Sequence, residues 1–200
     1  MKKEEKDKLY TEIFIKRQTY KDVSSKRELW KEIGNLFNGK LTIKQTKTMD
    51  LETLILKIPY KKSKIKLIET DTKPLKFKFD INFINKFEFS ISWEDTIEKF
   101  LKIFGKQDII IGEEKFDSKY LIQSNKEHLL KKILIDSDVK KLMIKHNIYL
   151  INCFYNKTKK SHEILTVINR TTDKMETLAE LIKLQFLLID RLESNRMIIV

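Results

Sequence analysis

Three histidines and one cysteine are the side chains of this sequence best suited to bind a metal ion or to act as a nucleophile: His128, His146, His162 and Cys153. No two of the histidines have the i, i+4 spacing that places two imidazoles on one face of a helix, and a single cysteine cannot build a cysteine-rich zinc site. Cys153 lies in an apolar stretch typical of a strand, where a buried, unreactive thiol is expected. The sequence therefore predicts no metal site and no catalytic cysteine.

Motifs for acid–base chemistry and for phosphate binding are also missing. The acidic pairs Glu94/Asp95 and Glu113/Glu114 fall at an expected helix start and in a turn, where nothing nearby indicates burial. The four glycines are isolated from one another, so they form no glycine-rich phosphate loop, and no serine nucleophile motif is present. We therefore expect a protein without enzymatic activity and without a cofactor.

A local group of lysines is the candidate for anion binding. Its members are expected around the turn of a β-hairpin, with alternate side chains on one side, and they are Lys57, Lys61, Lys62, Lys64 and Lys66. Such a group could bind an anionic membrane or nucleic acid. The sequence favours another interpretation, in which a charged strand edge prevents aggregation between sheets.

The overall charge leaves that choice open. The net charge is +12 and the basic residues are spread along the chain. Only five of the 41 Lys and Arg residues are arginine, the side chain that binds phosphate and guanine through two parallel hydrogen bonds. Abundant lysine is also expected from an AT-rich genome, which would require no ligand.

The composition predicts one soluble domain in a reducing compartment. An apolar fraction of 41%, with twelve phenylalanines, is sufficient for a sizeable core. One cysteine allows no internal disulfide, and we find neither a signal peptide nor an apolar stretch long enough to span a bilayer. We expect a cytoplasmic protein, with peripheral attachment to a membrane as the alternative.

Alternation of apolar and charged residues predicts an antiparallel sheet with one side in contact with solvent. The pattern is clearest over residues 75–80 and 87–93, where Phe77, Phe79, Phe87, Phe89 and Ile91 would face the core. Further strands are expected over residues 41–48, 53–60, 64–69 and 120–123, and as a hairpin over 148–155 and 164–169.

Helical spacing of apolar residues completes an α+β fold. Residues 1–38 are expected to form a helical arm, in which Ser25 and Glu28 have the spacing of a capping box, and residues 39–200 form the body of the same single domain. Other helices are expected over residues 92–104, 124–134 and 138–145, and a long C-terminal helix over 173–194.

The C-terminal helix is expected to make a second contact. Its inward stripe consists of Leu178, Leu181, Ile182, Gln185, Leu188, Ile189 and Leu192. Leu184, Phe186 and Leu187 lie partly off this stripe, so the middle of the helix is apolar nearly all round and should be covered on both sides. The N-terminal arm, through Leu9, Ile13 and Phe14, is one candidate cover, and a second copy of the chain is the other.

Residues 97–134 contain a recognisable succession of features: a short helix ending at Gly105, Asp108 before apolar residues, Gly112 with an acidic residue, Phe116-Asp117, and an apolar strand followed by a leucine-rich helix. This pattern resembles a loose group of uncharacterised bacterial proteins, which often carry membrane helices ahead of such a segment. The resemblance implies no activity. Physically, Asp108 and Asp117 are expected to accept hydrogen bonds from backbone N–H groups in turns.

These observations favour a non-enzymatic interaction or scaffold domain that binds a protein partner or forms a homodimer. A peripheral binder of anionic membrane or nucleic acid through lysines is the second hypothesis. The third is a small-ligand pocket enclosed by the phenylalanine-rich strands.

Overall fold

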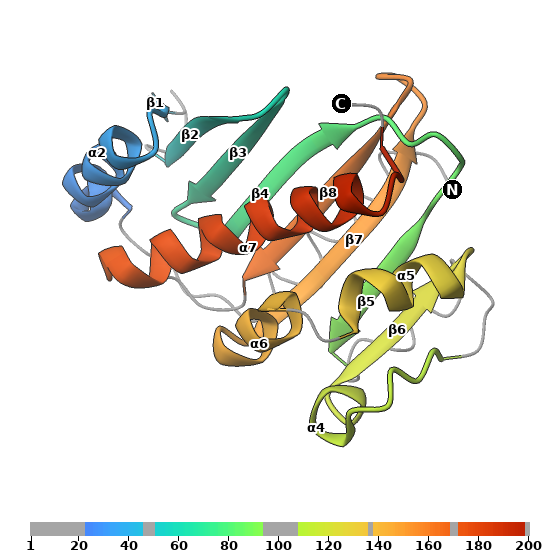
Figure 1. Cartoon of the computed structure of the whole chain (residues 1–200). Coiled ribbons are helices and arrows are strands. Elements are labelled where there is room, and N and C mark those ends of the chain that lie inside the picture. The colour runs from blue at the N-terminus through green and yellow to red at the C-terminus, as the bar shows by residue number, and fades with distance from the viewer. Residues whose placement is uncertain (1–22, 46–50, 94–107, 136–137, 169–171, 199–200) are drawn as a thin grey trace.

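Eight strands of this chain pair into one antiparallel sheet. The computed structural model describes residues 23–45, 51–93, 108–135, 138–168 and 172–198. Its strands are β1 Lys40–Gln45, β2 Glu52–Tyr60, β3 Ser63–Thr70, β4 Lys73–Ile81, β5 Phe89–Trp93, β6 Tyr120–Ser124, β7 Ile148–Asn156 and β8 Ser161–Ile168. Their order across the sheet is β1-β2-β3-β4-β8-β7-β5-β6 (Figure 1).

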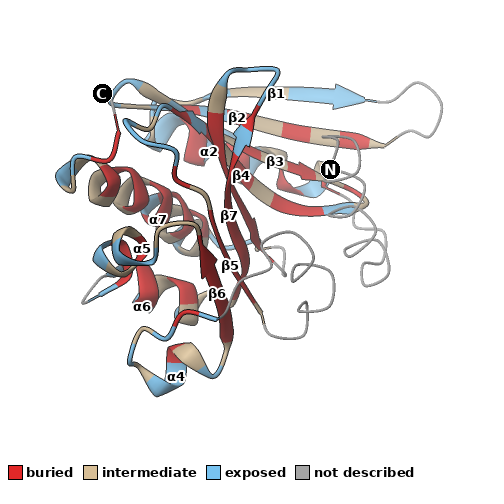
Figure 2. Ribbon diagram, turned by 90° about the vertical axis from the view of Figure 1, so that its right-hand side faces the viewer, coloured by how far each residue is buried: buried red, intermediate tan, exposed pale blue. Residues whose placement is uncertain are grey.

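Helices cover one face of this sheet. They are the 3-10 turn η1 Ser24–Lys26 and the α-helices α2 Arg27–Leu36, α4 Glu114–Asp117, α5 Glu127–Leu134, α6 Asp138–Lys145 and α7 Met175–Ser194. Helix α7 runs across β4 and β8, and α2 lies beside β1 and β2 (Figure 1). In Figure 2, α5, α6 and α7 all lie on the same side of the sheet. The fold is α+β with a long C-terminal helix, as the sequence predicts.

The covered face contains the core that the alternation pattern predicts. Phe77, Phe79, Phe87, Phe89 and Ile91 are all buried, which confirms their expected orientation. Their charged neighbours on β4, Lys76 and Lys78, point to the other face, because successive side chains of a strand alternate. The same alternation is visible along β2, β3 and β4 in Figure 2.

Long-range pairing joins the first four strands to the rest of the sheet. Strands β1 to β4 follow one another as hairpins, but β4 pairs with β8, so that Phe79 lies opposite Ile164. The hairpin of β7 and β8 forms where the sequence predicts it, and β5 pairs with both β6 and β7. Strand β8 thus connects two parts of the sheet that are distant in the chain.

The residues before the first strand are fixed to the ends of β2 and β3 by buried polar contacts. One carboxylate oxygen of Asp71 accepts the N–H of Val23 at 2.8 Å, and the other accepts the N–H of Glu52 at 2.6 Å. Lys26 forms a buried ion pair with Glu69 at 2.8 Å. Residues 23–36 therefore pack on the body, while residues 1–22 of the expected arm lie outside the described residues.

Two local predictions from the sequence have opposite outcomes. Asp117 accepts the N–H groups of Ile111, Gly112 and Glu113, as expected for a turn residue. Asp108 instead accepts the N–H of Ile122 on β6, which is fourteen residues away in the chain. Ser92, in contrast, does not cap a helix. It is buried in β5 opposite Leu121 and Leu150, because strand pairing outweighs the local capping pattern. Most of the helix predicted over residues 92–104 lies outside the described residues.

The inward stripe of α7 is confirmed. All seven predicted stripe residues are buried, and so is Leu184. Within the described ranges, no helix combines the length and the apolar character needed to cross a membrane.

Candidate functional site

The β2–β3 hairpin separates the predicted lysine group into two sets. Lys57 on β2 lies directly opposite Lys66 on β3, and Lys64 lies two residues from Lys66 on the same face of the sheet. Lys61 and Lys62 form the turn at the end of the hairpin. The first three lysines therefore share one face of the sheet, and the other two lie at its end.

Strand register extends this surface beyond the hairpin. Lys40 on β1 is the cross-strand partner of Lys57, and Lys78 on β4 is the partner of Lys66. Four lysines thus form one row across four adjacent strands, on the face opposite the helices. Alternation places three more lysines on that face, and we call the whole set the basic face: Lys40, Lys44, Lys57, Lys64, Lys66, Lys76 and Lys78.

Counter-charges are concentrated at one end of the row. Lys78 forms an ion pair with Glu163 at 3.0 Å, and Lys159 bridges Glu163 at 2.8 Å and Asp80 at 2.6 Å. Burial opposes ionisation of Glu163, but Lys78 and Lys159 hold its pKa below the ordinary value. Glu163 therefore carries its negative charge at neutral pH and belongs to this end of the row.

The rest of the row has no such partner. Among the residues that the structure describes, none forms an ion pair with Lys40, Lys57 or Lys66. Like charges directly opposite one another on a sheet are destabilising. The row therefore costs folding free energy that nothing in this part of the chain offsets by pairing.

The position of the lysine row corrects the interpretation that the sequence favours, which is protection of a strand edge. The hairpin lysines were expected to protect a strand edge, but β2 and β3 have neighbours on both sides in the sheet. Lys57 and Lys66 project from the face and not from an edge, so blocking edge pairing does not explain them. Sequence reasoning did not group Lys40 and Lys78 with them, although the alternation in β4 already marks Lys78 as facing solvent.

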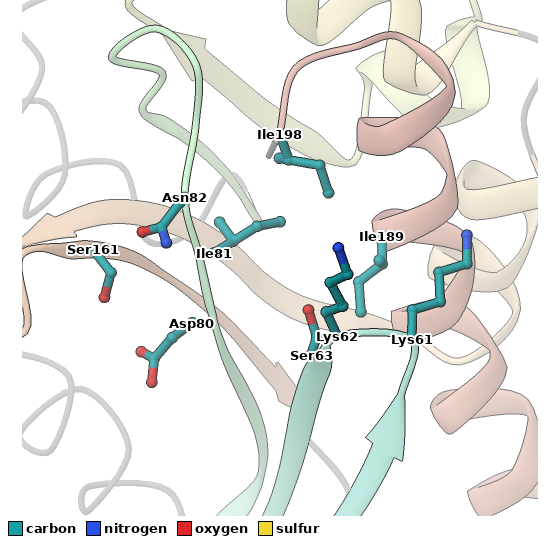
Figure 3. A pocket seen from close by; sticks show the side chains of 9 residues that line it. All are labelled: Lys61, Lys62, Ser63, Asp80, Ile81, Asn82, Ser161, Ile189 and Ile198. Carbon is teal, nitrogen blue, oxygen red and sulfur yellow. The ribbon is translucent and has the colours of Figure 1, made fainter. Parts of the chain in front are cut away.

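A cavity of about 230 Å³ lies beside the hairpin turn. Figure 3 shows isoleucine side chains and Lys62 around it, with polar side chains from β4 and β8 on one side. Its lining residues are Lys61, Lys62, Ser63, Asp80, Ile81, Asn82, Ser161, Ile189 and Ile198. Lys61 forms ion pairs with Asp190 and Glu193, which raise its pKa, and Asp80 is held by Lys159. These two charges already serve intrachain contacts, so they are poor ligand-binding groups.

The residues with nucleophilic or metal-binding chemistry lie apart from the basic face. Cys153 is completely buried on the opposite face of the sheet, and burial raises the pKa of its thiol. His146 contacts Glu180 at 2.7 Å, His162 is buried beside Phe83, and His128 is exposed on α5. In the described ranges, no group of three His, Cys, Asp or Glu residues is arranged to hold a metal ion.

The predicted interface residues of α7 have partners within this chain. Leu184 is completely buried, and Phe186 stacks on Tyr60 with ring centroids 3.9 Å apart and also meets Phe37 edge-on. Leu187 is half-buried. An interface through these residues stays a prediction, and the arm residues proposed to cover them lie outside the described ranges.

Comparison with known proteins identifies the fold. No family model and no curated protein matches the chain. Among solved structures, the chain is similar to the crystal structure of the mycobacterial trehalose monomycolate transport factor A, TtfA, with a TM-score of 0.51 and 7% sequence identity. The alignment covers 83% of this chain and 95% of that one. At this identity the similarity shows a shared fold alone.

Proposed function

We propose that this chain is a non-enzymatic cytoplasmic interaction domain that docks on an anionic macromolecular surface through the basic face. The observation that carries this proposal is the row of Lys40, Lys57 and Lys66, which lies on adjacent strands without an ion-pair partner among the described residues. An arrangement that costs stability in the free protein gains its counter-charges when an anionic partner is bound.

Two further features support a binding role over a catalytic one. The cysteine is buried with a raised pKa, and two of the three histidines contact neighbouring side chains of this chain. The structural neighbour is described as a transport factor, which is in keeping with an accessory role.

The experiment compares two double charge reversals with the same net charge. Lys57→Glu/Lys66→Glu changes the basic face, whereas Lys132→Glu/Lys183→Glu changes exposed positions of α5 and α7. Retention on immobilised heparin is measured at increasing salt. We expect the first variant to elute at clearly lower salt than the second, because binding through clustered lysines depends on their position and on counterion release. Equal elution of both variants would show that only the net charge matters and would refute the proposal.

A further inference from the structure

The basic face extends in two dimensions. Its central row crosses four strands, which lie about 4.8 Å apart, so it spans roughly 14 Å. Along β1, Lys44 lies four residues beyond Lys40, or about 13 Å. Lys64 and Lys76 lie on opposite sides of the row, each two residues from a member of it. The lysines therefore cover an area, whereas a nucleic-acid backbone presents its charges along a line.

The side chains between the lysines are aliphatic or small. Ile55 and Ile68 are direct cross-strand partners next to the lysine row, and both are half-buried. Thr42 on β1 and Lys76 on β4 are the outer cross-strand neighbours of this isoleucine pair. Thr53 and Thr70 lie next to the pair on the side away from the lysine row. This part of the sheet thus presents a small aliphatic patch bordered on one side by the lysine row.

This surface lacks the groups that nucleic-acid contacts use most. No aromatic side chain and no arginine occupies the outward positions of β1 to β4. Stacking on aromatic rings and bidentate hydrogen bonds from arginine supply much of the binding to bases and phosphates. Lysine, a mobile point charge on an apolar stem, suits a layer of headgroups that can rearrange around it.

Building on the proposed function, we infer that the anionic partner is the headgroup layer of a bilayer containing anionic phospholipid. The basic face lies flat on this layer, with the ammonium groups among the headgroup phosphates and carboxylates. Ile55 and Ile68 then contact the interface between headgroups and acyl chains. The protein binds peripherally and by charge, so its binding weakens as salt screens the lysines.

The test uses the whole chain in flotation with vesicles of phosphatidylcholine alone or of phosphatidylcholine with about 30% phosphatidylserine. A 20-base-pair DNA duplex at the same salt concentration is the second probe. The proteins are wild type, Lys57→Glu/Lys66→Glu, the matched control Lys132→Glu/Lys183→Glu, and Ile55→Ser/Ile68→Ser, which leaves the charge unchanged. Circular dichroism and thermal unfolding establish that each variant is folded.

We expect wild type to float with the phosphatidylserine vesicles and not with phosphatidylcholine alone, and to bind the duplex more weakly. Reversal of Lys57 and Lys66 should lower vesicle affinity at least ~10-fold, while the control keeps most of it. The isoleucine variant should bind vesicles more weakly and the duplex unchanged.

The remaining outcomes separate the two ideas. Duplex binding that depends on Lys57 and Lys66, without vesicle binding, would overturn the lipid inference and leave the proposed function standing. Vesicle binding reduced equally in both charge-reversal variants would overturn the inference, because net charge alone would account for it. Binding to neither probe and no retention on heparin would overturn both.

Discussion

Thr166 on β8 and Gln185 on α7 share a 2.9 Å hydrogen bond in the core, and neither residue has any exposed surface. The threonine hydroxyl donates to the amide oxygen of Gln185, whose amide nitrogen in turn donates to the carbonyl of Leu181 at 3.4 Å. This polar link holds the long helix at one position over the sheet, because sliding the helix would leave both side chains unpaired in an apolar environment.

Removing one partner of this hydrogen bond should therefore lower the free energy of unfolding more than removing both partners. We expect Thr166→Val to lower the free energy of unfolding by about 1–3 kcal/mol, because the amide oxygen of Gln185 loses its donor. The double variant Thr166→Val/Gln185→Leu should recover part of that loss. Urea denaturation measures both values, and a double variant no more stable than Thr166→Val would contradict the coupling.

Phe89 on β5 should be essential to the core. It is 1% exposed and its ring centroid lies 5.2 Å from that of Phe87. We expect Phe89→Ala to lower the free energy of unfolding by about 3–5 kcal/mol, because the change leaves a cavity. A loss below about 1 kcal/mol would show that this face is not core.

Glu163 should make the stability depend on pH. Its pKa is lowered in the folded state, where Lys78 and Lys159 outweigh the effect of burial. The stabilisation is present above the unfolded pKa of about 4.3 and is lost as pH falls through the folded pKa. We expect the urea midpoint of the wild type to decrease as the pH is lowered from 6 to 3. The Glu163→Gln variant should have a lower midpoint than the wild type at pH 6, and its midpoint should decrease less over the same pH range. An unchanged pH dependence in this variant would assign the acid sensitivity to other carboxylates.

Phe186 should stabilise the chain itself before any partner is considered. Its ring stacks on Tyr60, whose hydroxyl donates to Asp190 at 2.8 Å. We expect Phe186→Ala to lower the free energy of unfolding by about 1–3 kcal/mol, because both packing and the aromatic pair are lost.

Light scattering over a range of concentrations tests the predicted interface on α7. A mass that rises with concentration for wild type but not for Leu187→Glu would support the predicted interface on α7.

Local sequence patterns predict most of this fold because most of its elements are specified locally. Helix α6 has the predicted boundaries, and the ends of β7 and β8 differ from those of the predicted hairpin by at most three residues. Ser92 shows where such reasoning fails. The serine and the acid three residues later have the spacing of a capping box, yet pairing with β6 and β7 keeps Ser92 in a buried strand. A local motif contains no information about the strands that will pair with it in the folded protein.

The candidate site is predictable only in part, for the same reason. The hairpin alone brings Lys57, Lys64 and Lys66 together, so their grouping follows from the sequence. Lys40 and Lys78 join them through the register of β1 with β2 and of β3 with β4. The sequence also does not show that β2 and β3 are interior strands, which removes edge protection as the explanation of their lysines.

The junction of β4 with β8 also has a consequence for the order in which the protein folds. Strands β1 to β4 need only adjacent hairpins, whereas β4 and β8 must meet across a long stretch of chain. Contacts of high sequence separation close slowly, so the four-stranded meander is expected to form first. Its lysines then approach one another before Glu163 arrives on β8 to neutralise Lys78. Added salt should therefore speed the early phase of refolding by screening this repulsion.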